Sequence, residues 1–214
     1  NFPETTVSLA THKLSAQYTQ LNSKYLVVFE SGLGDDRSVW KTKETAMKIG
    51  ETTDVVIYDR AGYGKSTIGS DPRNIARLTE ELEAVVDQFA NGRKVILVGH
   101  SLGGLVVRDY AIKNAQKVAG IIFVDPTHED YNSPTQAMED LIFNSFSAEY
   151  GSSSGAAKEA RELIEDLIYA SSLPNLPQIP VVVLTSMKND QANINSDQAN
   201  QKTRQDWFNA HESL

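Results

Sequence analysis

The chain has 214 residues, enough for one well-buried domain with a small insertion and too few for two large domains. Its residues are 40% hydrophobic and 22% charged, as in an ordinary globular protein, and its longest apolar runs fall short of the roughly 20 residues of a membrane span. The net charge of −8, without clusters of Lys and Arg, argues against nucleic acid as a partner and mainly implies solubility. The lack of cysteine excludes disulfides, thiol catalysis and thiolate metal sites, but it leaves the cellular compartment open.

Apolar runs and helical periodicities alternate along residues 1–126. We expect strands over residues 5–10, 13–19, 25–30, 55–59, 94–98 and 118–126, and helices over residues 38–49 and 72–90 and from residue 102 onward. Strands that alternate with helices at this spacing predict an α/β fold, in which a mostly parallel twisted sheet is covered by helices on both faces.

Local signals add detail to two of these segments. Asp71 and Pro72 supply N-cap and first-turn signals for the helix over residues 72–90. Asp59 and Arg60, at the end of a predicted strand, are interpreted as a structural ion pair.

The alternation changes after Pro126. Residues 127–177 contain two predicted helices, over residues 135–147 and 156–171, joined by a flexible segment rich in Gly and Ser. We interpret them as a helical cap over the active-site edge of the sheet. A buried strand over residues 179–185 and a helix from Asp197 onward follow. The domain prediction is therefore a core in two parts, residues 1–126 and 178–214, with a cap at residues 127–177.

The stretch Gly99-His100-Ser101-Leu102-Gly103 follows a run of apolar, mostly β-branched residues and opens a segment with helical periodicity. It has the pattern G-x-S-x-G, in which small neighbours let the chain turn tightly while the serine hydroxyl points out of the sheet. The Leu102 N–H would lie at the start of the helix, where unpaired donors and the helix dipole stabilise a negative oxygen. The pattern therefore predicts that Ser101 is a nucleophile.

Two glycine-rich loops resemble nucleotide-binding motifs but lack a required residue. After Gly32 and Gly34, the third glycine of G-x-G-x-x-G would fall at Arg37, which argues against a dinucleotide site. The segment that ends in Gly64-Lys65-Ser66 has Asp59 where a phosphate-binding loop needs its first glycine. The first loop is better interpreted as the source of a second oxyanion donor, the Leu33 N–H, facing Ser101.

Four motifs together make the chain resemble the α/β-hydrolase superfamily, specifically its capped esterase-like branch. They lie at residues 30–34, 58–66, 99–104 and 124–130, and a weaker similarity resumes over residues 179–190. The resemblance implies that Ser101 is the nucleophile and that the Leu33 and Leu102 amides form the oxyanion hole. It also implies an acid on the loop after a late strand, where Asp190 stands, with Asp125 as the rival acid. The chemistry needs neither a metal nor an organic cofactor.

A serine hydroxyl also needs a base, and the chain contains four histidines. We expect His12 to be structural or exposed, and His100 to point away from the Ser101 hydroxyl. His128 could line the pocket, together with Asp125. His211 is the one histidine after Asp190, but no apolar strand intervenes to carry it to the sheet edge. The resemblance therefore predicts that this chain stops before the catalytic histidine and before the final strand and helix of the fold.

These observations predict a serine hydrolase that acts on a small ester-like molecule through a Ser101 acyl-enzyme. The alternative, from another class, is a hydrolase-fold protein that binds or signals without turnover, since a base is not evident. Aromatic and apolar residues of the cap either line an apolar acyl or alcohol pocket or form the cap's own core: Tyr131, Met138, Phe143, Phe146 and Tyr150. The natural substrate and the oligomeric state stay open.

Overall fold

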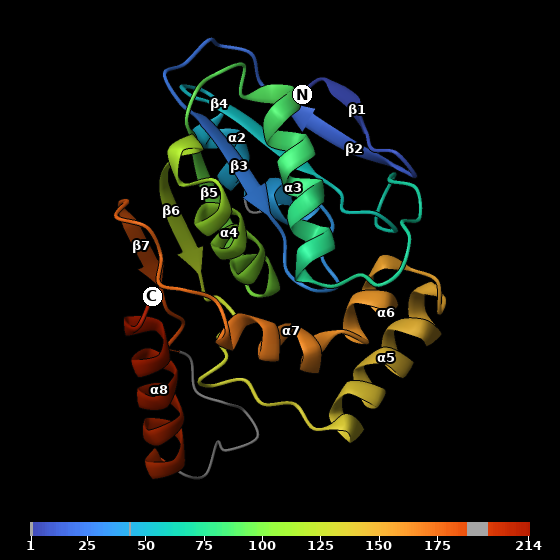
Figure 1. The fold of residues 1–214 in the computed structure, drawn as a ribbon, viewed down its shortest axis with the longest axis vertical. Coiled ribbons are helices and arrows are strands. Elements are labelled where there is room, and N and C mark those ends of the chain that lie inside the picture. Colours follow the sequence, from blue (N-terminus) through green and yellow to red (C-terminus); the bar gives the residue numbers. More distant parts are fainter. Residues whose placement is uncertain (1, 43, 188–196) are drawn as a thin grey trace.

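The computed structural model describes residues 2–42, 44–187 and 197–214, and it contains a seven-stranded sheet covered by helices (Figure 1). The strands are β1 Glu4–Ser8, β2 Lys13–Tyr18, β3 Leu26–Glu30, β4 Asp54–Tyr58, β5 Val95–His100, β6 Val118–Val124 and β7 Val181–Leu184. They lie in the order β1-β2-β4-β3-β5-β6-β7, antiparallel from β1 through β2 to β4 and parallel from β4 to β7. The prediction of a mostly parallel α/β sheet is confirmed.

The two central strands show why the sheet needs helices on both faces. All five positions of β3 and all five of β4 are buried, as expected for parallel strands inside an α/β fold. Because side chains alternate across a strand, Val28 packs on one face, with α3 (Ile75–Phe89) and α4 (Leu102–Lys113). Phe29 packs on the other face, with Trp40 of α1 (Ser38–Thr42) and with α2 (Thr45–Ile49).

The cap consists of α5 (Gln136–Tyr150), α6 (Gly155–Ala160) and α7 (Leu163–Ser171). Figure 1 shows these helices beyond the carboxyl ends of the parallel strands, the edge at which open α/β sheets build their sites. The last helix, α8 (Asp197–Glu212), lies below β7 in the same view, and a single 3₁₀ turn at Ala115–Lys117 precedes β6.

Two predicted helices are each divided in two. Over residues 38–49, Glu44 adopts a left-handed conformation (φ 56°), which a helix cannot continue through, so α1 and α2 are separate. Over residues 156–171, α6 and α7 are separate, and Glu162 between them leaves helical geometry (φ −103°, ψ 2°). Neither break coincides with a Gly or Pro, which is why the sequence did not signal them.

The start of α3 also differs from the prediction. The N-cap is Asn74 rather than Asp71, and its side-chain oxygen accepts a hydrogen bond from the Arg77 N–H. Asp71 instead forms an ion pair with Lys158 of the cap, at 3.0 Å.

The predicted ion pair between Asp59 and Arg60 is wrong. Arg60 pairs with Glu30 and with Glu159 of the cap, at 2.8 and 2.7 Å. Asp59 faces the other way, where it accepts a hydrogen bond from the Arg37 N–H at 2.9 Å. Successive side chains after a strand point to opposite sides, so neighbours in sequence found different partners.

The strand predicted over residues 179–185 forms as β7, but it is not fully buried. Val182 and Leu184 are 51% and 53% exposed. In the described part of the chain β7 pairs with β6 alone, so β7 is an edge strand there.

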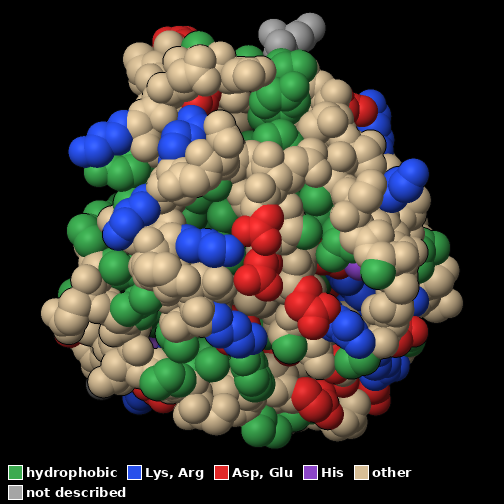
Figure 2. All heavy atoms as spheres, turned by 45° about the horizontal axis from the view of Figure 1, so that its top comes forward, with side chains coloured by type: hydrophobic (Ala, Val, Ile, Leu, Met, Phe, Trp, Pro, Cys, Tyr) green, Lys and Arg blue, Asp and Glu red, His purple; other side chains and the backbone are tan. Residues whose placement is uncertain are grey.

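Charged side chains of both signs are mixed on the face that Figure 2 shows, with Lys and Arg beside Asp and Glu rather than in one basic stripe. Within the residues the structure describes, no helix combines the length and the apolar character needed to cross a bilayer.

Candidate active site

Ser101 occupies the turn between β5 and α4 in an unusual backbone conformation, with φ 50° and ψ −122°. Backbone hydrogen bonds hold it there. Its N–H donates to the Val124 carbonyl at 3.2 Å, and its own carbonyl accepts from the Gly104 and Thr127 N–H groups at 2.9 and 3.0 Å. Non-glycine residues at positive φ persist only where the surroundings fix them, and such residues cluster at functional sites. The geometry matches the strand-turn-helix context that the G-x-S-x-G pattern requires.

The two glycines of the pattern are needed because neighbouring groups come too close for a side chain. A Cβ on Gly99 would lie 2.6 Å from Val107 Cγ2, and a Cβ on Gly103 would lie 2.5 Å from the Glu30 carbonyl oxygen. The second contact is with the backbone at the end of β3. The elbow and the loop after β3 therefore touch directly, main chain to main chain.

The loop after β3 runs beside Ser101. A Cβ on Gly32 would lie 3.2 Å from the Ser101 Cβ, so the chain passes the nucleophile before it reaches Leu33. Leu102 is the first residue of α4 and is 2% exposed, and the first N–H groups of a helix have no partner within the helix. The structure thus brings together the segments that carry the two expected oxyanion donors, Leu33 and Leu102.

The Ser101 hydroxyl has a neighbour that the sequence did not single out. Its Oγ lies 3.5 Å from the Thr127 Oγ1, at the limit of a hydrogen bond. Thr127 follows β6 and its N–H is bonded to the Ser101 carbonyl, so backbone pairing places it there. The sequence could have indicated Thr127 as a site residue only through its position just after a predicted strand.

Asp125 stands at the end of β6 in a left-handed conformation, with φ 46°. Its Oδ1 accepts hydrogen bonds from the Ser186 N–H at 2.9 Å and from the Trp207 Nε1 at 2.7 Å. The carboxylate therefore ties the loop after β7 and α8 to the end of β6. Asp190, the preferred acid, lies outside the described residues.

His211 is 3% exposed, and both of its ring nitrogens have partners. Its Nε2 lies 2.8 Å from the Pro126 carbonyl oxygen, which can only accept, so Nε2 carries the proton. Nδ1 then accepts from the Thr185 hydroxyl at 2.8 Å. Burial lowers the pKa of His211, although the Pro126 carbonyl acts in the opposite sense. In this arrangement neither nitrogen is free to bond the Ser101 hydroxyl.

His128 is 2% exposed and lies beside the C-terminal end of α8. Its Nδ1 accepts from the Asp130 N–H at 3.1 Å, and its Nε2 lies 3.0 Å from the Ser213 Oγ at the end of α8. Burial lowers its pKa too, and the nearby Glu129 carboxylate acts against this shift.

The remaining histidines lie on other groups. His12 bonds Glu81 at 2.9 Å, which makes it structural. The His100 Nδ1 lies 3.6 Å from a carboxylate oxygen of Asp35, and its ring meets Trp40 edge-on at 6.3 Å. Among the described residues, then, no histidine nitrogen is hydrogen-bonded to Ser101 Oγ.

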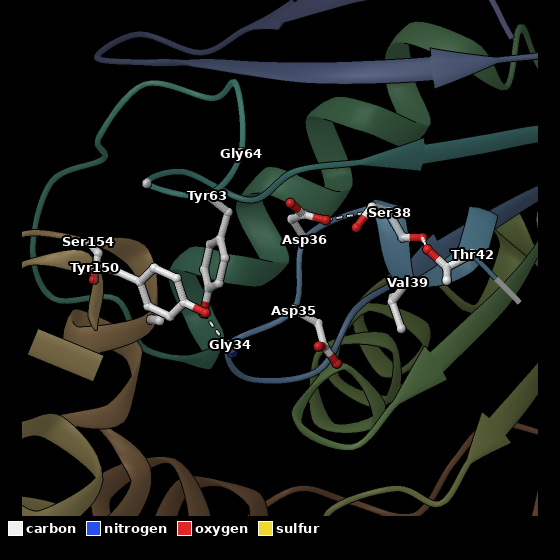
Figure 3. A pocket seen from close by; sticks show the side chains of 12 residues that line it. Gly34, Asp35, Asp36, Ser38, Val39, Thr42, Tyr63, Gly64, Tyr150 and Ser154 are labelled. Carbon is white, nitrogen blue, oxygen red and sulfur yellow. Dashed lines mark hydrogen bonds between the residues drawn. The ribbon is translucent and has the colours of Figure 1, made fainter. Parts of the chain in front are cut away.

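A pocket of about 560 Å³ opens between the loop after β3, the loop after β4 and the cap (Figure 3). Gly34, Asp35 and Tyr63 line it from the core, and Tyr150 and Ser154 line it from the cap. Of the cap residues in question, Tyr150 thus faces a pocket, whereas Tyr131 packs on Trp207 and Phe143 lies under Arg161. Met138 is 52% exposed. Across the described residues, no group of three or more His, Asp or Glu side chains is arranged to hold a metal.

Comparison with known proteins agrees with this architecture. Residues 25–175, more than half of the chain, match the family described as the alpha/beta hydrolase fold. An uncharacterized protein of Bacillus subtilis, YqjL, is 29% identical over 125 residues, which cover 58% of this chain and 49% of the relative. The chain spans half or less of the length of the curated relatives it matches.

Solved structures share the fold at low sequence identity. A thermophilic esterase from Thermogutta terrifontis is 18% identical with a TM-score of 0.67, and the match covers 94% of this chain and 86% of the esterase. Epoxide hydrolase A from Mycobacterium thermoresistibile is 16% identical with a TM-score of 0.66, and the match covers 86% and 82% of the two chains. Given the family match, the sheet order and the serine elbow, the chain belongs to the α/β-hydrolase fold family.

Proposed function

We propose that the protein is a serine hydrolase that cleaves a carboxylic ester of a small molecule. The observation that carries the proposal is the strained turn that presents Ser101 between β5 and α4, against the loop that contains Leu33. A serine at this position favours acyl transfer, whereas the epoxide hydrolases of the superfamily would use an aspartate there.

The proposed reaction has two halves. The Ser101 Oγ attacks the ester carbonyl carbon while its proton passes to a base, and the negative oxygen of the tetrahedral intermediate accepts from the Leu33 and Leu102 N–H groups. The intermediate collapses, the ester bond breaks, and the alcohol leaves with the proton from the base. Water then attacks the acyl-enzyme in the same way and releases the acid and free Ser101.

The base is the open part of the proposal. His211 and His128 are engaged with Pro126 and Ser213, so in the described arrangement neither serves Ser101. The identity of the catalytic base stays a prediction.

The preference for Asp190 over Asp125 as the acid also stays a prediction, and the two are separable by substitution. With Asp190 as the acid, Asp190→Asn should lower kcat at least about 100-fold, by analogy with the loss when a triad aspartate is replaced. Asp125→Asn, which keeps an oxygen acceptor for Trp207, should lose much less. Loss of turnover at Asp125 alone would reverse this preference.

The experiment that tests the function is active-site labelling of the natural protein. A fluorophosphonate should add one adduct mass, located at Ser101 by peptide mapping, and hydrolysis of p-nitrophenyl acetate should disappear in step with labelling. Ser101→Ala should abolish both, and Thr127→Val, which removes the neighbouring hydroxyl, should retain labelling. The intact mass of the same sample states whether the chain extends beyond these 214 residues.

A second function is favoured by one observation, the absence of a histidine bonded to Ser101 in the described residues. On that alternative the protein binds a ligand or a partner without turnover. A natural full-length protein that folds but takes no fluorophosphonate would support it and would contradict the hydrolase.

A further inference from the structure

Glu159 of the cap helix α6 inserts a carboxylate into the core of the molecule. It is fully buried, and its Oε1 and Oε2 accept hydrogen bonds from Nε and Nη2 of Arg60 at 2.8 and 2.7 Å. Its Oε2 also accepts from the Tyr63 hydroxyl at 2.7 Å. Both partners belong to the loop after β4, so one carboxylate of the cap holds two neighbouring side chains of the core.

The same arginine holds the loop that passes Ser101. Its Nη1 donates to the Ser31 carbonyl at 2.6 Å, and its Nη2 donates to the Gly32 carbonyl at 2.9 Å. Nη1 also pairs with Glu30 at the end of β3, at 2.8 Å. Arg60 is 2% exposed, so water does not replace these partners. A guanidinium offers its donors in a fixed planar fork, and the position of Arg60 therefore determines where the two carbonyls lie.

Tyr63 holds the loop from its other side. Its hydroxyl accepts a hydrogen bond from the Gly34 N–H at 3.2 Å while it donates to Glu159, and Figure 3 shows this hydroxyl pointing at Gly34. Ser31 and Gly32 before Leu33, and Gly34 after it, are thus all bonded to groups that converge on Glu159. Leu33 lies between the fixed points.

We propose that Glu159, acting through Arg60 and Tyr63, is a positioning residue that couples the seating of the cap to the geometry of the Leu33 amide. The inference rests on the proposed function, because it assigns that amide to the oxyanion hole. When α6 is seated, the carboxylate completes both bonded chains, and the loop is held as the elbow requires. When α6 moves away, Arg60 keeps Glu30 but loses its bidentate partner, and Tyr63 loses its acceptor.

The coupling predicts a loss of transition-state stabilisation rather than of substrate binding. Removing an oxyanion donor outright costs about 100- to 1,000-fold in kcat, so a donor that is displaced but present should cost about 10- to 100-fold. For p-nitrophenyl acetate, KM should change less than about threefold, since binding that is equal in the ground state and the transition state is unaffected.

Three variants of the natural protein test this. Tyr63→Phe removes the hydroxyl that accepts from the Gly34 N–H and donates to Glu159, and Glu159→Gln removes the charge that holds Arg60. Tyr169→Phe is the matched control, because the Tyr169 hydroxyl of α7 also donates to a buried carboxylate, that of Asp109 at 2.8 Å, and joins cap to core away from the loop. We expect Tyr63→Phe and Glu159→Gln to lower kcat and to weaken a trifluoromethyl ketone inhibitor by the same factor, and Tyr169→Phe to change neither.

Amide hydrogen exchange supplies a readout that does not depend on turnover, and it needs only Tyr63→Phe and Tyr169→Phe to fold. Exchange in a peptide that covers residues 31–36 should accelerate in Tyr63→Phe and stay as in the unmodified protein in Tyr169→Phe. Equal exchange and equal kcat in these two variants would overturn the inference. An unmodified protein without turnover would contradict the proposed function instead, and the exchange comparison would still decide whether the loop is held through Tyr63.

Discussion

At the scale of single residues, the strain at Ser101 should be measurable as lost stability. Its φ of 50° and ψ of −122° suit glycine, so the side chain is kept there at a cost of about 1–3 kcal/mol. Ser101→Gly should relieve that strain, less the 0.4–1 kcal/mol or so that glycine loses through the greater freedom of the unfolded chain. We therefore expect Ser101→Gly to unfold with a free energy about 1 kcal/mol higher than Ser101→Ala.

Urea unfolding of the two variants measures this difference. Ser101→Ala is the matched control because it lacks the hydroxyl but keeps the Cβ, so the comparison isolates the backbone conformation from the lost contact with Thr127. A glycine variant less stable than the alanine variant would show that the conformation is not strained, and the strongest mark of a functional turn would be lost.

Some residues of the site could be predicted from the sequence, and others could not. Ser101 and the segments of Leu33 and Leu102 were predictable because one short motif fixes the turn and because parallel strands bring their carboxyl ends to one edge. Thr127 and Glu159 were not. The bond from Arg60 to Glu159 joins residues 99 positions apart, and no local pattern determines which of many acidic residues will be buried against an arginine.

At the scale of elements, strands were predicted better than helix boundaries. The run over residues 26–29 is apolar throughout, as burial on both faces of the sheet demands. The break at Glu44 is different. A left-handed glutamate is locally unfavourable, so tertiary packing of Trp40 and Ala46 against the sheet determines it rather than propensity. The N-cap of α3 was missed because Asp71, Asn74 and Pro72 all signal a helix start within four residues.

A buried carboxyl group where α7 contacts the start of α3 should make the stability of the protein depend on pH. The Oδ1 of Asp166 accepts from the Ile75 N–H at 2.8 Å, where α3 begins, and the side chain is 1% exposed. Burial raises the pKa of Asp166 to about 8, and nearby Glu162 adds to the shift. The folded protein thus keeps a proton that the unfolded chain releases near pH 4, so the stability from this group is full below that pH and is lost as the pH rises towards 8.

Asp166→Asn removes this titration and keeps an oxygen for the Ile75 N–H. Its free energy of unfolding, relative to the unmodified protein, should improve by at least ~1 kcal/mol between pH 5 and pH 8.5, since one pKa unit corresponds to about 1.4 kcal/mol. Urea unfolding at the two pH values measures the change. Asp140→Asn, on the exposed side of α5, should show no such trend, and a parallel response of the two variants would remove Asp166 as the cause.

For the molecule as a whole, the mostly parallel sheet and the helical segment over residues 127–177 followed from the alternation of elements, while the order of the strands and the contacts of α8 did not. Periodicity predicted the helix, but its contacts come from single polar side chains. Trp207 donates to Asp125, and His211 bonds Pro126 and Thr185, all near the ends of β6 and β7. These bonds form between groups far apart in sequence, so the helix was predictable and its partners were not.

The seating of α8 should weaken in acid. Burial lowers the pKa of His211 and of His128, which lie close together where α8 contacts the end of β6. The carboxylates of Asp125, Glu129 and Asp130 are nearby. The unfolded chain therefore takes up protons near pH 6.5 while the folded joint resists them. The stability from these groups is present above that pH and is lost as the pH falls. Protonation would also cost His211 its acceptor role at Nδ1, because the imidazolium only donates.

Hydrogen exchange of residues 201–212, measured relative to the intrinsic exchange rate at each pH, should accordingly accelerate as the pH falls from 7 to 5. Exchange of α3, measured in the same way, should stay slow. His211→Gln keeps a donor for Pro126 and an acceptor for Thr185 but does not titrate, so it should reduce the acceleration, and His128→Gln should reduce the remainder. His12→Gln, at the far side of the sheet on Glu81, is the control. If all three variants respond alike, the acid sensitivity belongs to the molecule as a whole, and the two buried histidines do not govern how α8 is held against the sheet.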